Sequence, residues 1–269
     1  MKWNSIVSAA VLGVTSILTL PAHAITITNT DGTFNWTGFD WDSQATAFTT
    51  GFQPVNNDLF TLTYFGVATN LRNGGTNLNL GGLDNNADGV ASNSYEYTLV
   101  ATLNERVTGC AGTTCTFEVQ SGTYSIYYDL AQDANATAGS KGTGFQNGTL
   151  LISGTFAVQS GGTFTVSGDG GIGVTTLQGA VSSTNLTYIN PALSTTTVTT
   201  TLQLGSATTN NYVSPGGFNN VAFDGSEIVF QADANQSFTA AQIPEPISLA
   251  LVGSALIAGG WVSRRRIKK

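Results

Sequence analysis

The sequence predicts an all-β fold, an antiparallel β-sandwich with long polar loops, for which a jelly-roll topology stays open. Three observations support this prediction. Apolar and polar residues alternate in several short stretches, turn residues separate these stretches, and residues 25–243 show no helical period. Short antiparallel strands at such spacing are typical of sandwiches.

The clearest strand pattern runs from Tyr95 to Leu103. Its odd-numbered residues are apolar or aromatic and share one face, while Glu96, Thr98 and Thr102 take the other, so we expect a half-buried strand. Similar alternation occurs in Leu59 to Val67, Cys115 to Val119, Tyr124 to Leu130, Leu150 to Val158, Phe164 to Val166, Val198 to Leu204 and Ile228 to Phe230. A Gly-Thr-aromatic triplet, in which glycine is expected to supply the turn, opens four stretches at Gly32, Gly122, Gly154 and Gly162.

Two segments differ from this pattern. Asn70 to Asn93 is rich in Asn and Gly and is long enough to indicate a functional or mobile loop. Ser194 to Thr201 is rich in Thr, which favours an exposed edge strand over the alternative of a glycan-bearing surface.

Residues 1–24 have the pattern of a secretory signal peptide. Ile6 to Leu20 is an apolar run too short to span a bilayer comfortably, and Ala22 and Ala24 form the small-x-small site that signal peptidase needs. Pro21 breaks a helix at this point, which argues against the alternative of a retained anchor. We expect cleavage after Ala24.

Residues 244–269 have the features of a second address tag. The apolar stretch Ile247 to Ser263 contains 17 residues, and as a helix it would reach about 25 Å against about 30 Å of hydrocarbon. The basic cluster behind it would hold the C-terminus on the cytoplasmic side, so the body would lie outside the inner membrane. The flanking residues are Pro244, Glu245 and Pro246 before the stretch, and Arg264, Arg265 and Arg266 after it.

These three parts, in this order at the end of the chain, resemble the sorting signal of PEP-CTERM proteins, which exosortases recognise and cut in Gram-negative bacteria. The alternative is an ordinary anchor behind a surface loop. The resemblance covers residues 244–269 only. It implies exosortase and signal peptidase as partners during export, transient contact with the inner membrane, and the cell surface or extracellular matrix as the destination.

The body carries a resemblance of its own. Gly122 to Asp129 and Gly142 to Ile152, together with Phe39 to Asp42, are similar to PEP-CTERM proteins associated with flocculation, the clumping of cells within exopolysaccharide. The resemblance implies a role in aggregation and carries over no catalytic residue.

Residues 25–243 form one predicted domain of 219 residues, which is long enough to bury a core. The segment holds three basic residues against 15 acidic ones, a formal charge of −12. Such a surface repels nucleic-acid phosphates and anionic membranes, so we expect no nucleic-acid partner. All 14 Phe and all 8 Tyr lie here, which argues against disorder.

The body lacks the side chains on which much enzyme chemistry depends. The single histidine is His23, inside the signal peptide. Cys110 and Cys115 should form a disulfide after export, since redox motifs space their cysteines by two residues and zinc sites need more ligands. Histidine bases, histidine metal ligands and free thiols are therefore missing from the predicted mature chain, and we expect no enzyme activity.

Two groups of residues near the mature start are candidate sites. Asp40 and Asp42 lie two apart on an expected strand and point the same way, whereas a glycosidase needs two carboxyls facing each other across a sugar. Trp36 and Trp41 could contact sugar rings, although packing in the core is the favoured interpretation for such large side chains.

The most ligand-like string is Asp84 to Gly89. Asp84, Asn86 and Asp88 occupy alternate positions with glycine sixth, as in the first half of a calcium loop. The expected glutamate of the second half falls on Tyr95 instead. An Asn-rich turn is the favoured alternative, and calcium is the one cofactor that the sequence suggests.

Three functions follow from these observations. The first is a secreted, exosortase-processed matrix protein that promotes flocculation or biofilm formation with exopolysaccharide. The second is a carbohydrate-binding module with a defined sugar site, and the third is a glycan-cleaving enzyme.

Overall fold

The computed structural model describes residues 24–241, and within them every regular element is a β-strand. None of these residues belongs to a helix long and apolar enough to cross a membrane. The predicted sorting tail and, apart from Ala24, the predicted signal peptide lie outside the described residues. The strands are β1 (Thr26–Asn29), β2 (Gly32–Asn35), β3 (Gly38–Trp41), β4 (Ala45–Thr50), β5 (Leu59–Asn73), β6 (Thr76–Asn77), β7 (Glu96–Ala111), β8 (Thr114–Asp129), β9 (Thr149–Phe156), β10 (Gly161–Ser167), β11 (Gly170–Thr184), β12 (Ile189–Asn190), β13 (Leu193–Gly205), β14 (Gly217–Phe218), β15 (Val221–Ala222) and β16 (Ile228–Ala240).

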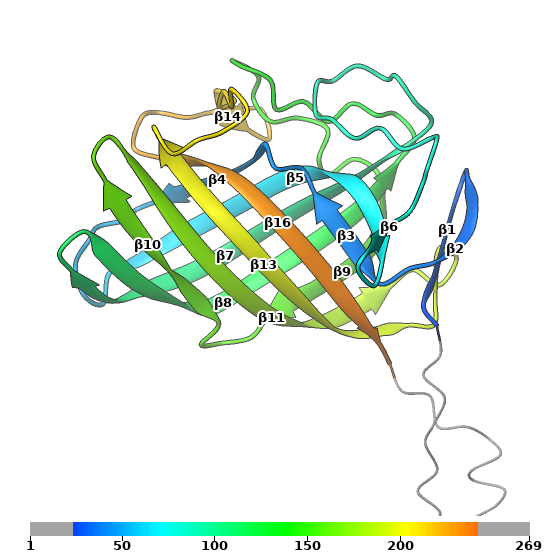
Figure 1. Ribbon diagram of the computed structural model, residues 1–269, viewed down its shortest axis with the longest axis horizontal. Coiled ribbons are helices and arrows are strands. Elements are labelled where there is room, and N and C mark those ends of the chain that lie inside the picture. The colour runs from blue at the N-terminus through cyan, green and yellow to red at the C-terminus, as the bar shows by residue number, and fades with distance from the viewer. Residues whose placement is uncertain (1–23, 242–269) are drawn as a thin grey trace, which may run out of the picture. The chain divides into compact units, whose positions relative to one another are not determined.

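One antiparallel sheet of 11 strands closes on itself (Figure 1). Around the ring, β11 pairs with β13, β13 with β16, β16 with β3 and β4, these with β5, and then follow β7 and β8. Strand β8 pairs with β9 and β10, and both pair with β11, which completes the ring. The predicted all-β, antiparallel class is confirmed. Two separate sandwich sheets are not seen, because the pairing is continuous around a barrel of 8 strand positions.

Long strands explain why the sheet closes. Strands β7 and β8 have 16 residues each, and their pairing shifts register at two β-bulges. Bulges bend a strand and increase its twist, which lets a sheet curl until its edges meet. The expected edge strand Ser194 to Thr201 lies within β13 and pairs on both sides, so that prediction is wrong.

Most of the predicted turn glycines lie inside strands, where neighbouring strands or side chains come too close for a Cβ atom. Three of the four expected turn glycines lie inside strands, namely Gly122, Gly154 and Gly162. A Cβ on Gly154 would lie 2.1 Å from the carbonyl oxygen of Ala180 and 2.5 Å from the Tyr124 hydroxyl. The predicted turn role is therefore wrong for these three, because the curved sheet needs room for neighbouring strands and side chains.

Aromatic side chains fill the interior near β1 and β2. The Trp36 ring lies 5.0 Å from the Phe39 ring and 5.2 Å from the Phe238 ring, and the Phe39 ring lies 5.3 Å from that of Tyr97. Each of these side chains is at most 7% exposed. This end of the closed sheet is therefore packed solid by large rings.

A second apolar cluster lies on the outer face of β5 and β7. Phe65, Val67 and Val100 pack there against Ala134 and Phe145, which belong to the segment between β8 and β9. Loops therefore cover part of the outer face of the sheet. The stretch from Tyr95 to Leu103 is buried on both of its faces, whereas the sequence predicted burial of one face only.

Candidate metal centre

Three carboxyl groups meet at one end of the β7–β8 hairpin. Glu96 begins β7 and Asp129 ends β8, and the two residues are direct partners across the strands. Asp133 follows in the next loop. One carboxylate oxygen from each residue lies within 4.8 Å of the other two. Antiparallel pairing therefore brings Glu96 next to like charges that lie more than 30 residues later in the sequence.

Burial makes this cluster of carboxylates energetically unfavourable unless a bound cation compensates its charge. Glu96 is 1% exposed and Asp129 is 7% exposed. Glu96 Oε1 accepts a hydrogen bond from the Ala134 N–H at 3.1 Å, and Asp129 Oδ1 accepts one from the Ala131 N–H at 2.8 Å. The second oxygen of each carboxyl, Glu96 Oε2 and Asp129 Oδ2, is buried without a hydrogen-bond partner.

Asp84 is a fourth acidic residue near this cluster. It is 1% exposed, its Oδ1 also has no partner, and its Oδ2 accepts a hydrogen bond from the Ser92 hydroxyl at 3.4 Å. Burial raises the pKa of Glu96 to about 8, against the lowering effect of the Ala134 N–H, with further increases from Asp129, Asp133 and Asp84. Full ionisation of all the carboxyls in the cluster is therefore unfavourable.

No cation within residues 24–241 compensates this charge by a salt bridge. The one salt bridge of this range joins Arg106 to Glu118, elsewhere on the β7–β8 hairpin. Oxygen atoms are the ligands that Ca²⁺ prefers, at 2.3–2.6 Å, so two ligands of one ion lie at most about 5 Å apart. The spacing of Glu96, Asp129 and Asp133 meets this limit. These residues fit a calcium ion, with Asp84 beside them.

The loop between β8 and β9 positions Asp133. Both of its carboxylate oxygens accept from the Asn147 side-chain amide at 3.0 Å. Gly144 has a φ of +83°, and a Cβ there would lie 2.3 Å from the Asp133 carbonyl oxygen. Only glycine allows this approach without strain. A polar cavity of about 380 Å³ begins here, lined by residues that include Asp133, Gln146, Asn147, Phe218, Asn219 and Asn220.

The predicted calcium loop is only partly reflected in this centre. Asp84 is brought to it, but Asn86 and Asp88 are exposed. Asn86 Oδ1 accepts from the Asp88 N–H at 3.2 Å, and Asp88 Oδ1 accepts from the Val90 N–H at 2.8 Å. These two side chains stabilise turns, which was the favoured alternative.

Sequence reasoning missed Glu96, Asp129 and Asp133 as a group. The one local signal was Glu96, a charged residue on the polar face of a predicted strand. Its partners come from the next strand and the loop behind it, and no spacing rule relates such positions before the strand register is known.

The structure corrects the predicted sugar contacts. Trp36 is 0% exposed and Trp41 is 1% exposed, so neither ring can touch a polymer in this fold. The Trp41 indole N–H donates to Gln236 Oε1 at 3.2 Å inside the core. The favoured alternative, core packing, is confirmed.

Asp40 and Asp42 remain half-buried beside a third carboxyl that the sequence did not reveal. Asp42 Oδ1 accepts from the Gln44 N–H at 2.9 Å. Burial raises the pKa of Asp42, with a further contribution from Asp233 of β16, and burial together with Asp40 raises the pKa of Asp233. The pairing of β16 with β3 brings Asp233 to this patch.

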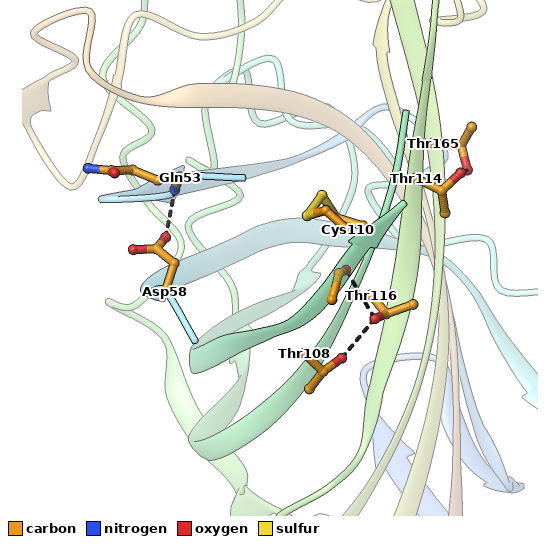
Figure 2. Close-up of a disulfide and its surroundings, with 9 residues drawn as sticks. Gln53, Asp58, Thr108, Cys110, Thr114, Thr116 and Thr165 are labelled. Carbon is orange, nitrogen blue, oxygen red and sulfur yellow. Dashed lines mark hydrogen bonds between the residues drawn. A yellow bond between two sulfur atoms is a disulfide. The ribbon is translucent and has the colours of Figure 1, made fainter. Parts of the chain in front are cut away.

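The predicted disulfide is confirmed. Cys110 and Cys115 are direct partners across β7 and β8 and are bonded at the tip of the hairpin (Figure 2). The Thr114 hydroxyl bonds to that of Thr165 at 2.9 Å, which fastens the hairpin to β10. The bridge therefore closes a turn that the ring of strands already holds.

Comparison with known proteins found no match for this chain among family models, curated proteins or solved structures.

Proposed function

We propose that this chain is an exported, calcium-binding matrix protein that exosortase processing leaves at the cell surface or in the extracellular matrix. There it promotes cell aggregation together with exopolysaccharide and acts by binding and assembly, not by turnover. The observation that carries the calcium-binding role is the cluster of the Glu96, Asp129 and Asp133 carboxyls, in which Glu96 and Asp129 are buried and each has one oxygen without a hydrogen-bond partner.

Calcium suits the destination that the two terminal tags imply. Extracellular calcium modules bind with dissociation constants of roughly 10⁻⁴–10⁻³ M, so they fill outside the cell and stay empty in the cytoplasm. An acidic body of formal charge −12 would repel acidic polysaccharide at short range unless divalent cations bridge the two. Calcium thus stabilises the fold after export and supports its contact with the polymer.

Two of the three segments that carry the flocculation resemblance contribute to the candidate centre. Gly122 to Asp129 ends with one of the carboxyls. Gly142 to Ile152 contains Gly144 and Asn147, which position Asp133. The longer two segments of the resemblance and the site geometry therefore involve the same part of the chain, which supports the proposal.

Thermal unfolding with calcium and with a chelator tests the metal. A ligand at 100 times its dissociation constant stabilises the folded state by about 2.7 kcal/mol, which for a domain of this size raises the melting temperature by about 5–10 °C. Asp129→Asn should lose most of this response and should be more stable than the wild type in chelator, because one buried like charge is gone. The matched control, Asp88→Asn, changes an exposed turn residue and should keep the full response.

Equal melting temperatures in calcium and in chelator would remove calcium from the proposal. The matrix role has its own test. Deleting the gene should leave polysaccharide synthesis intact but disperse the cells, and wild-type protein should restore clumping where protein lacking residues 244–269 does not. Clumping that persists in the deletion strain would refute that role.

A carbohydrate-binding module is the second candidate, and the polar cavity beside Asp133 favours it. Side-chain amides and two phenylalanines, Phe145 and Phe218, line that cavity, and such groups bind sugar hydroxyls and sugar faces. Gln146→Ala with Asn219→Ala should weaken binding to purified exopolysaccharide severalfold in a depletion assay. Unchanged binding would leave the assembly role as the better account.

A further inference from the structure

An apolar cavity of about 430 Å³, here called the inner cavity, lies inside the closed sheet. It occupies the end that carries the disulfide drawn in Figure 2, and Cys110 and Cys115 contribute to its wall. Strands β4, β5, β7, β8, β10, β13 and β16 all supply lining residues, so the cavity is surrounded by the ring. Its aromatic lining consists of Phe52, Phe60, Phe117, Phe164 and Phe230.

Glu105 is the one charged residue among the lining residues. It is 1% exposed, and its Oε2 has no hydrogen-bond partner. A smaller space of about 40 Å³ continues beyond it, with Tyr64 in its wall. A buried carboxyl without a partner destabilises a fold, so its position at the inner end of an apolar cavity indicates a polar contact supplied from outside the chain.

We propose that the inner cavity binds a small apolar molecule with a single uncharged hydrogen-bonding head group, of the chemistry of a medium-chain alcohol, whose hydroxyl meets Glu105. The volume falls in the range of about 300–1,000 Å³ that is usual for small-molecule sites, and apolar walls with few convergent polar groups are their usual lining. A charged head group would lose its hydration without gaining a counter-charge.

This site is independent of the proposed metal centre. Glu96 lies at one end of β7, and Glu105, the cavity residue nearest to it on this strand, follows nine residues later, which corresponds to about 30 Å of extended strand. Chelation of calcium from the folded protein should therefore leave the inner cavity able to bind.

Displacement of a neutral fluorophore tests the proposal. Protein recovered from the surface of the producing cells, without detergent, is titrated with N-phenyl-1-naphthylamine, which fluoresces when it leaves water. Competing 1-alkanols should then bind about fourfold more tightly per added methylene until the cavity is full. Leu204→Trp and Val166→Trp narrow the rim from β13 and β10, and each should reduce fluorophore binding at least tenfold. Val174→Trp places the same side chain on a position of β11 that is 55% exposed and should change nothing.

The head-group contact has a separate readout. The ratio of 1-octanol affinity to n-octane affinity should fall about two- to tenfold in Glu105→Leu, because one hydrogen bond is lost. In Glu105→Gln the ratio should stay close to that of the wild type, since the amide still donates and accepts. Fluorophore binding that is absent in the wild type, or unchanged in both rim variants, would overturn the site. An affinity ratio that Glu105→Leu does not alter would overturn the role of Glu105.

Discussion

Replacing Glu105 with Gln should stabilise this protein by an amount that grows as the pH rises. Burial raises the pKa of Glu105 from 4.5 to about 8 in the folded state. The unfolded chain releases this proton near pH 4.5, whereas the folded protein holds it until about pH 8. The contribution of protonated Glu105 to the free energy of unfolding is therefore fully present below pH 4.5 and is lost as the pH rises towards 8.

The magnitude follows from that one proton. Between the two pKa values the folded state binds about one proton more than the unfolded state, so the free energy of unfolding falls by about 1.4 kcal/mol per pH unit. At pH 7 the accumulated cost is about 3 kcal/mol, a large part of the stability of an ordinary domain. Gln has nearly the same shape and does not ionise, so the variant escapes this loss.

The titration of other side chains does not affect the comparison between Glu105→Gln and the wild type. Tyr64 is the other titratable side chain lining the space around Glu105, and its pKa is raised well above 10 by burial, with smaller increases from Asp42, Asp233 and Asp40, so it stays neutral throughout. Glu96, with a pKa of about 8, titrates equally in both proteins and cancels in the difference.

Urea unfolding from pH 5 to pH 8 measures the effect. The difference in unfolding free energy, variant minus wild type, should rise by about 1.4 kcal/mol per pH unit between pH 5.5 and pH 7.5. Glu118→Gln is the control, because its partly exposed carboxyl has a lowered pKa through its hydrogen bonds to Arg106 and Gln120. That variant should show no such rise. A difference for Glu105→Gln that stays flat with pH would refute the reasoning, whatever its absolute value.

Three further predictions address the fold and its processing. Changing Cys110 and Cys115 together to Ser should lower the free energy of unfolding by about 2 kcal/mol in urea, the loop entropy of so small a ring, and a much larger loss would mean that the bridge holds more than its turn. Trp36→Ala should cost about 3–5 kcal/mol by the same measurement, because the ring is 0% exposed; a loss below 1 kcal/mol would contradict its place in the core. Intact-mass analysis of extracellular protein should find a chain that begins after Ala24 and ends near Pro244 to Pro246, and a mass that includes the arginine cluster would count against the second cut.

The sequence by itself determined the features that depend on neighbouring residues. Alternation along Tyr95 to Leu103 and the absence of a helical period identified the β class, since side-chain direction in a strand is a local property. Cys110 and Cys115 are the only two cysteines of the chain and lie close in sequence, so their pairing needed no knowledge of the fold. Composition alone established the acidity of the body.

Tertiary structure decided everything that depends on strand partners. Ring closure created the inner cavity and buried the two tryptophans, and the register of β7 on β8 set Glu96 opposite Asp129. The pairing of β9 with β8 and β11 placed Gly154 where no side chain fits, although its sequence context indicates a turn. The physical reason is that each strand of this sheet could pair with several others of similar composition. Burial and packing over the whole domain select among them, and no local pattern records that choice.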